Sequence, residues 1–194
     1  MARKKGLTFY QKKKKISASL MKECMNYLFL VLASVLVAFV LVFSIGMKTS
    51  VIGVSMEPAL YNGQEILVNR FVYKLLKPKA GDIVVFLPGG NQNSHYYVKR
   101  VAAQPGDTVV IREGILYVND IPYTHTELDK IADPGILENE LTLEADEYFV
   151  IGDNINNSED SRSGNIGPVK ADSMIGKVWF HMASSGSGMG FIDR

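Results

Sequence analysis

The chain combines one long apolar run near its N-terminus with a series of short alternating segments in the remainder. The apolar run extends from Leu28 to Met47 and contains no charged residue. Because an α-helix rises 1.5 Å per residue, about 20 apolar residues cross the roughly 30 Å hydrocarbon core of a bilayer. The pattern therefore predicts a transmembrane helix over residues 28–47, between a tail of residues 1–27 and a larger domain of residues 48–194.

The two parts that flank this run differ in charge. Residues 1–27 contain eight basic side chains and one acidic side chain, whereas the rest of the chain contains 13 basic and 19 acidic side chains. A basic tail can bind nucleic acid, but this tail adjoins an apolar run, so we expect the lipid bilayer as its partner and no nucleic acid. The positive-inside rule places residues 1–27 in the cytoplasm. We therefore expect a single-pass cell-membrane protein whose domain 48–194 is extracytoplasmic.

A cleaved secretory signal peptide is the alternative interpretation of the same run. Ser44-Ile45-Gly46 matches the small-x-small pattern of a cleavage site, and it leaves self-cleavage near Ser44–Gly46 open. The apolar core of a signal peptide is typically about 7–15 residues long, and its basic segment is shorter than this one. The sequence therefore favours a retained anchor.

Residues 48–194 consist mainly of short runs rich in Val, Ile, Tyr and Phe between turn-forming residues, a pattern typical of strands. Residues 121–146 are acidic and irregular, and we interpret them as an insertion or a small cap. The predicted fold is mainly β: an extended antiparallel β core with a small irregular cap, preceded by one N-terminal transmembrane helix. The expected strands are Glu65–Val68, Asp82–Phe86, Tyr96–Ala102, Thr108–Arg112, Ile115–Val118, Glu147–Ile151 and Lys177–His181.

Cysteine is scarce, which excludes some chemistry. The one cysteine, Cys24, belongs to the expected cytoplasmic tail. The domain outside the membrane therefore has neither a disulfide nor a thiol nucleophile.

A serine and a lysine are the strongest candidates for catalysis. Ser55 follows a short apolar segment and directly precedes Met56-Glu57-Pro58. Lys99 and Arg100 lie on a predicted strand whose side chains alternate between faces, so one of the two must point inward if the strand is half buried. Burial lowers the pKa of a lysine, and a neutral amine can take the proton of a serine hydroxyl. The alternative is that both are surface charges on an edge strand.

A third segment, Gly152–Gly164, is rich in turn-forming residues and follows an apolar strand. Asp160 and Arg162 are spaced to form a charge-assisted pair. The same segment offers oxygen donors for calcium, but their spacing does not match an EF-hand loop; these donors are Asp153, Asn156, Glu159 and Asp160. We therefore expect no metal site here.

The three histidines, His95, His125 and His181, formally allow a Ser-His-Asp arrangement. His125 is the best placed of them, but its surroundings do not look like a catalytic segment. We interpret all three as loop or sheet residues.

Taken together and in order, these segments resemble bacterial type I signal peptidases of the lysine-using, Gram-positive-like kind. The resemblance runs from the apolar run to about Phe180. The matching segments are Ser55-Met56-Glu57-Pro58, Glu65–Phe71, Gly81–Phe86, Tyr97–Val101 with Pro105-Gly106-Asp107, and Gly152-Asp153-Asn154 through Asp160-Ser161-Arg162.

This resemblance implies a membrane-anchored serine endopeptidase that removes N-terminal signal peptides from secreted preproteins, with the secretion machinery as a further partner and no cofactor. It implies a preference for small residues at positions −1 and −3 of the substrate. It also implies a role for seven residues: Ser55 as nucleophile, Lys99 as general base, Ser158 as a hydroxyl that positions the lysine, Asp160 and Arg162 as a structural ion pair, and Met56 and Gly152 beside the active site.

Two positions depart from the family pattern. Gly53 stands where some members have a serine that donates a second hydrogen bond to the oxyanion, which leaves mainly the Ser55 backbone N–H. Ile155 stands where an arginine often follows Gly-Asp-Asn, so a contact made by that arginine is in doubt.

Two other functions fit parts of the same pattern. Ser–Lys self-cleaving proteases of the repressor type share a related β core, but they lack a spanning segment, and this chain has one at 28–47. An anchored extracytoplasmic binding module would need neither Ser55 nor Lys99.

Overall fold

The computed structural model describes residues 18–90, 95–124, 130–184 and 187–192. The chain divides into two compact units, Met1–Ser44 and Ile45–Arg194, which are described separately below.

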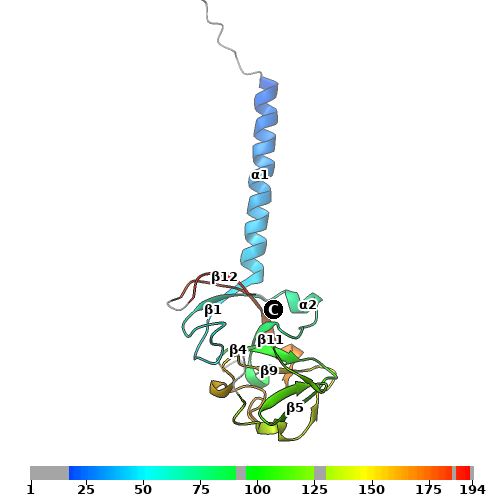
Figure 1. The fold of residues 1–194 in the computed structure, drawn as a ribbon. Helices are drawn as coiled ribbons and strands as arrows, with labels where there is room; N and C mark the ends of the chain where they lie inside the picture. Colours follow the sequence, from blue (N-terminus) through cyan, green and yellow to red (C-terminus); the bar gives the residue numbers. More distant parts are fainter. Residues whose placement is uncertain (1–17, 91–94, 125–129, 185–186, 193–194) are drawn as a thin grey trace, which may run out of the picture. The chain divides into compact units, whose positions relative to one another are not determined.

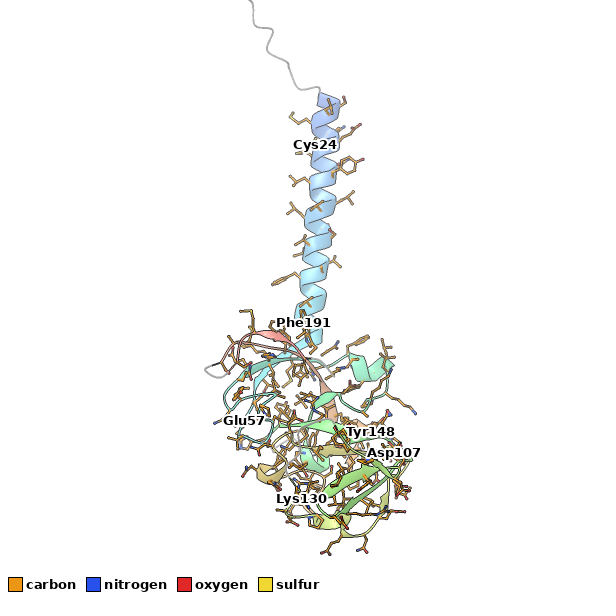
Figure 2. All side chains as sticks on the ribbon, viewed as in Figure 1. Cys24, Glu57, Asp107, Lys130, Tyr148 and Phe191 are labelled. Atoms are coloured by element: carbon orange, nitrogen blue, oxygen red, sulfur yellow. The ribbon has the colours of Figure 1, made fainter. Side chains whose placement is uncertain are left out.

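The first unit is dominated by one helix, α1 (Ala18–Ile45), which is continuous in Figure 1. Within it, Ser19–Val40 is long and apolar enough to cross a membrane, and its side chains are exposed on all sides of the helix (Figure 2). The helix begins before the expected range 28–47 because residues 18–27 include no glycine or proline that would end it. It stops two residues short of that range because the next residues form a strand.

The second unit is mainly β (Figure 1). Its large antiparallel sheet has the order β1-β2-β11-β3-β4-β9-β10, and β12 pairs with β11. The order brings together strands that are far apart in the chain. Its strands are β1 (Gly46–Ser50), β2 (Glu65–Asn69), β3 (Ile83–Phe86), β4 (Tyr97–Ala103), β9 (Glu147–Ile151), β10 (Val169–Lys170), β11 (Met174–His181) and β12 (Gly190–Phe191).

A smaller antiparallel sheet has the order β7-β6-β5-β8. It consists of β5 (Thr108–Arg112), β6 (Ile115–Val118), β7 (Ile121–Pro122) and β8 (Leu141–Thr142). β5 and β6 join through Glu113-Gly114, both at positive φ, as a tight hairpin turn requires. The segment expected to be an irregular insertion, 121–146, supplies β7 and β8 to this sheet, and its residues 125–129 lie outside the described part of the chain.

All seven strands expected from the sequence are present, within a few residues of their expected bounds. The strands that were not expected are β1, β7, β8, β10 and β12, most of which are only two residues long. Short helical turns complete the unit: helix α2 (Val72–Leu75) and the 3-10 turns Pro88–Gly90, Gly135–Glu138, Ile155–Asn157 and Ala171–Ser173.

Both faces of the large sheet are covered at its centre, which decides the environment of the candidate site. On β3, Ile83 and Val85 pack into one buried cluster, and Val84 and Phe86 pack into another. β4 pairs with β3 on one side and with β9 on the other. Side chains on either face of β4 are therefore removed from water.

Candidate active site

The segment that carries Ser55 is held on both sides of the serine. Next to it, Met56 is completely buried in the apolar cluster that also contains Val51. The backbone amide of Asn154 donates a hydrogen bond of 3.0 Å to the carbonyl oxygen of Ser55, and the Asn154 side chain donates one of 3.2 Å to the carbonyl of Val54. The core contact and the Asn154 clamp together fix the position of the serine.

Lys99 is the third residue of β4 and is only 4% exposed. Its Nζ is 2.6 Å from Ser55 Oγ, although 44 positions separate the two residues in the chain. The structure therefore brings together the two residues that the sequence singles out, at hydrogen-bond distance.

The protonation of Lys99 is shifted by its surroundings. Burial lowers the pKa of its amine to about 8, because a charged ammonium loses its hydration inside the protein. The nearby carboxylates of Asp160, Glu159 and Asp153 act in the opposite direction, and Arg162 lowers the pKa further. Burial dominates, so the neutral amine is far more populated near neutral pH than that of an ordinary lysine.

Arg100 departs from the expectation that only one of two neighbouring charged residues is buried. It is 6% exposed, and its guanidinium forms two hydrogen bonds of 2.7 Å to the carboxylate of Asp153. A third hydrogen bond of 3.0 Å goes to the carbonyl of Gly81. The alternation argument assumed a half-buried strand, but β4 is central and covered on both faces, so it buries both side chains. The alternative of two surface charges is wrong for the same reason.

The Asp160–Arg162 pair, which the spacing predicts, holds together the loop after β9. Arg162 Nε donates to Asp160 Oδ1 at 2.8 Å, and both side chains are buried. The same guanidinium donates to the carbonyls of Ile155 and Ser158, and Asp160 accepts a bond of 3.1 Å from the amide of Gly152. Two of the oxygen donors considered for calcium, Asp153 and Asp160, thus accept hydrogen bonds from arginine side chains.

Gly152 and Ser158 meet beside the serine. A Cβ atom on Gly152 would clash with Ser158 Oγ and with the carbonyl oxygen of Ser55. Ser158 Oγ is buried and has no hydrogen-bond partner in the described part of the chain, so the expected link to Lys99 is not formed in this structure. A buried hydroxyl without a partner is unusual and calls for an explanation.

The backbone amide of Ser55 points to no acceptor among the described residues. Gly53, two residues earlier, has φ +87° and open space where a Cβ would be, and its amide donates a 2.9 Å hydrogen bond to Asn62 Oδ1. The left-handed conformation favours glycine at this position. Ile155, at the position where relatives often have arginine, is buried in the cluster beneath the smaller sheet.

An open cleft of about 420 Å³ contains the Ser55–Lys99 pair. Two segments line it, Val51–Ser55 and His95–Lys99, together with Asn157 and Glu159. The phenol of Tyr97 donates a 3.3 Å hydrogen bond to Glu159, and the Lys99 amine lies 5.6 Å from the centre of the Tyr97 ring. Burial, and then Glu159, raises the pKa of Tyr97. The cleft is therefore mostly apolar, with a carboxylate at its rim.

The histidines do not replace the lysine. His125, the histidine considered as a base, lies outside the described residues. His181 Nδ1 lies 2.9 Å from the side-chain nitrogen of Gln64. His95 is exposed and lines the cleft, but the basic group at hydrogen-bond distance from Ser55 is that of Lys99.

Sequence reasoning missed three contributors to this site. Asn154, Tyr97 and Glu159 were not assigned roles, although Asn154 belongs to the Gly-Asp-Asn motif and Tyr97 lies two positions before the lysine on the same face of the strand. Glu159 carried no signal, because its place at the cleft depends on the path of the loop after β9.

Comparisons with known proteins show the family to which this chain belongs. A family model described as "Signal peptidase, peptidase S26" matches residues 24–183. Signal peptidase I T of Bacillus subtilis (strain 168) is 33% identical over 144 residues, which cover 66% of this chain and 69% of the relative. Signal peptidase IB of Staphylococcus aureus (strain N315) is 34% identical over 167 residues, which cover 76% and 85% respectively. A crystal structure of a signal peptidase I from Enterococcus faecalis V583 matches 53% of this chain and 97% of its own, with 28% identity and a TM-score of 0.40.

Proposed function

We propose a Ser–Lys mechanism and a membrane-anchored topology for this chain, which belongs to the signal peptidase family, peptidase S26. The chain is a serine peptidase of the signal peptidase I type, and its substrates are preproteins that carry signal peptides. Membership of this family argues against the two alternative functions, a repressor-type protease and a binding module.

In the proposed mechanism Ser55 is the nucleophile and Lys99 the general base. The neutral amine of Lys99 takes the proton of Ser55 Oγ as that oxygen attacks the carbonyl carbon of the scissile bond. The carbon–nitrogen bond then breaks, and the protonated amine returns the proton to the leaving nitrogen. Water hydrolyses the acyl-enzyme by the same route. The observation that carries this proposal is the 2.6 Å distance between a buried amine and the serine oxygen.

The developing oxyanion needs hydrogen-bond donors. The free backbone amide of Ser55 supports its assignment as one donor, because it has no acceptor among the described residues. Gly53 has no side chain to supply a second donor.

The remaining residues act as positioning groups. The hydroxyl of Ser158, buried without a partner in the described part of the chain, is available to the Lys99 amine once Ser55 Oγ has moved onto the substrate. Gly152 leaves room for this hydroxyl, and Met56 fixes the serine through the core. Asp160 and Arg162 hold the loop that presents Ser158.

The substrate is expected to lie extended in the cleft of about 420 Å³, between Val51–Ser55 and His95–Lys99. Main-chain hydrogen bonds to an exposed strand edge give affinity in such complexes, and pockets for alternate side chains give specificity. Apolar walls of this kind suit the small residues at −1 and −3 that the family resemblance implies.

The proposed topology follows from the charge around α1. The basic excess before the apolar stretch favours a cytoplasmic N-terminus, with the peptidase unit outside the cell membrane. In this arrangement the bilayer and the secretion machinery bring preproteins to the enzyme.

A cleavage assay tests the mechanism. The purified full chain in detergent is incubated with a purified preprotein, and the mature product is followed by electrophoresis and N-terminal analysis. Ser55→Ala and Lys99→Ala should each abolish cleavage, whereas Lys74→Ala, which changes an exposed lysine of α2, should retain it. Cleavage that persists in either of the first two variants would rule out the Ser–Lys mechanism.

A further inference from the structure

A second cleft, of about 510 Å³, adjoins the one that contains Ser55 and Lys99. Glu159 lines both clefts, and the three residues before it divide between them, with Asn157 on the first and Asn156 and Ser158 on the second. The other walls of the second cleft include Asp133, Gly135 and Arg162. The segment 156–159 is thus a shared wall between the two clefts.

The second cleft begins close to the nucleophile. Ser158 lies next to Ser55, because a Cβ atom added to Gly152 would clash with both Ser158 Oγ and the carbonyl oxygen of Ser55. Ser158 lines the second cleft and Ser55 lines the first. An extended chain advances about 3.3 Å per residue. A polypeptide whose scissile bond lies at Ser55 can therefore continue across the shared wall within a few residues.

The two clefts differ in character. The first is lined largely by apolar side chains, among them Val51, Ile52 and Val98. The second is more polar, with Asn156, Ser163 and two carboxylates beside the apolar Ala132 and Ile136. Apolar walls suit the signal peptide, and polar walls suit the hydrophilic start of a secreted protein.

The charge of the second cleft is negative. Asp133 and Glu159 are both exposed, and neither forms an ion pair with another described residue. Asp133 accepts a 2.9 Å hydrogen bond from the amide of Gly135. Arg162 does not balance them, because its guanidinium is committed to buried Asp160 and to backbone carbonyls. Two carboxylates therefore line the second cleft, and the carboxylate of Glu159, on the shared wall, also accepts the hydrogen bond from Tyr97.

We infer that the second cleft is a subsite for the first residues of the mature polypeptide, downstream of the scissile bond, and that Asp133 and Glu159 make it favour lysine or arginine over aspartate or glutamate there. This inference rests on the proposed function, since it places the scissile bond at Ser55. The inferred subsite adds specificity for the residues that follow the scissile bond, which leave the enzyme with the new amino terminus.

The test compares substrates within each enzyme. Preproteins that differ only by Lys or Glu at one of the first three mature positions are cleaved by the full chain in detergent, and the ratio of kcat/KM for Lys over Glu is measured. The enzymes are the unaltered chain, Glu159→Gln, Asp133→Asn, the double variant, and Glu144→Gln as the control. Glu144 is exposed and lines neither cleft.

We expect the unaltered chain to prefer Lys by about fivefold at one or more positions, as for partly exposed charge pairs. The preference should approach unity in the double variant and persist in Glu144→Gln. Because the ratio compares two substrates of one enzyme, changes in Ser55 or Lys99 chemistry cancel. Equal cleavage of Lys and Glu substrates by the unaltered chain at all three positions would overturn the subsite while leaving the proposed function intact. A preference that survives the double variant would overturn it too. Failure to cleave any preprotein would instead refute the proposed function.

Discussion

The amine of Lys99 and the hydroxyl oxygen of Ser55 lie 2.6 Å apart in a site where burial lowers the pKa of the amine to about 8. These two properties depend on each other. The buried position that brings Lys99 close to Ser55 also removes hydration from its amine, and this favours the neutral form, whose electron pair takes the proton of the serine.

The pH dependence of cleavage should report this amine. Since the neutral form is active, kcat/KM should rise with pH and reach half its maximum near pH 8. Glu159→Gln removes a carboxylate that raises the pKa of Lys99, so its rising limb should move to lower pH. A pH–rate profile of each enzyme checks this, with Glu144→Gln expected to match the unaltered chain. A rising limb whose midpoint lies near pH 10.5 in the unaltered chain would contradict the assignment of Lys99 as the base.

Lys99→Met should abolish cleavage and yet stabilise the fold. The pKa of Lys99 is lower in the folded chain than in the unfolded one, where it is near 10.5, so keeping the proton in the folded state is unfavourable. This cost, about 3 kcal/mol by the size of the shift, is fully present below pH 8 and disappears as the pH rises through 10.5.

Denaturant unfolding of the full chain in detergent measures this effect. The free energy of unfolding of Lys99→Met should exceed that of the unaltered chain at pH 7 by roughly 1–3 kcal/mol, since part of the gain is offset by the lost contact with Ser55. The difference should shrink at pH 10. Lys74→Met, at an exposed position, should change the free energy of unfolding little at either pH. If Lys99→Met had a lower free energy of unfolding than the unaltered chain at pH 7, burial of the Lys99 amine would not be unfavourable.

Arg100 and Asp153 should be strongly coupled. Both are buried and joined by two hydrogen bonds of 2.7 Å, so Asp153→Asn or Arg100→Met leaves one charge uncompensated and should cost about 3–5 kcal/mol of unfolding free energy. The double variant should cost clearly less than the sum. The exposed pair Arg112–Asp120 provides the matched comparison, with coupling below about 1 kcal/mol. Additive losses at Arg100 and Asp153 would show that their contact contributes no coupling.

Gly152→Ala should impair catalysis through crowding. The new methyl group would clash with Ser158 Oγ and with the carbonyl of Ser55, and it would displace the nucleophile. Misplacement of reacting groups by about 1 Å can cost about a hundredfold in rate. Gly164→Ala, where nothing lies within 4 Å of the added carbon, is the control. Measurement of kcat/KM for both variants decides the question, and equal activity would show that the loop adjusts without cost.

The site could be predicted from the sequence as far as its local motifs extend. Ser55, Lys99 and the Asp160–Arg162 pair all belong to short segments whose residues and order carry the family resemblance. Glu159 could not be predicted in the same way. Its neighbours in the chain are loop residues, and it reaches the cleft only because the loop after β9 crosses β4 near Tyr97.

The sequence by itself determined the long apolar N-terminal helix and the seven main strands, because those follow from the hydrophobic pattern within a few neighbouring residues. The tertiary structure alone decided that β4 lies between β3 and β9 with both faces covered. That position buries Lys99 and Arg100 together, whereas alternation along a single strand predicted one inward residue. The contacts responsible join residues 44 to 53 positions apart, and such pairings depend on the packing of the whole unit and not on local preference.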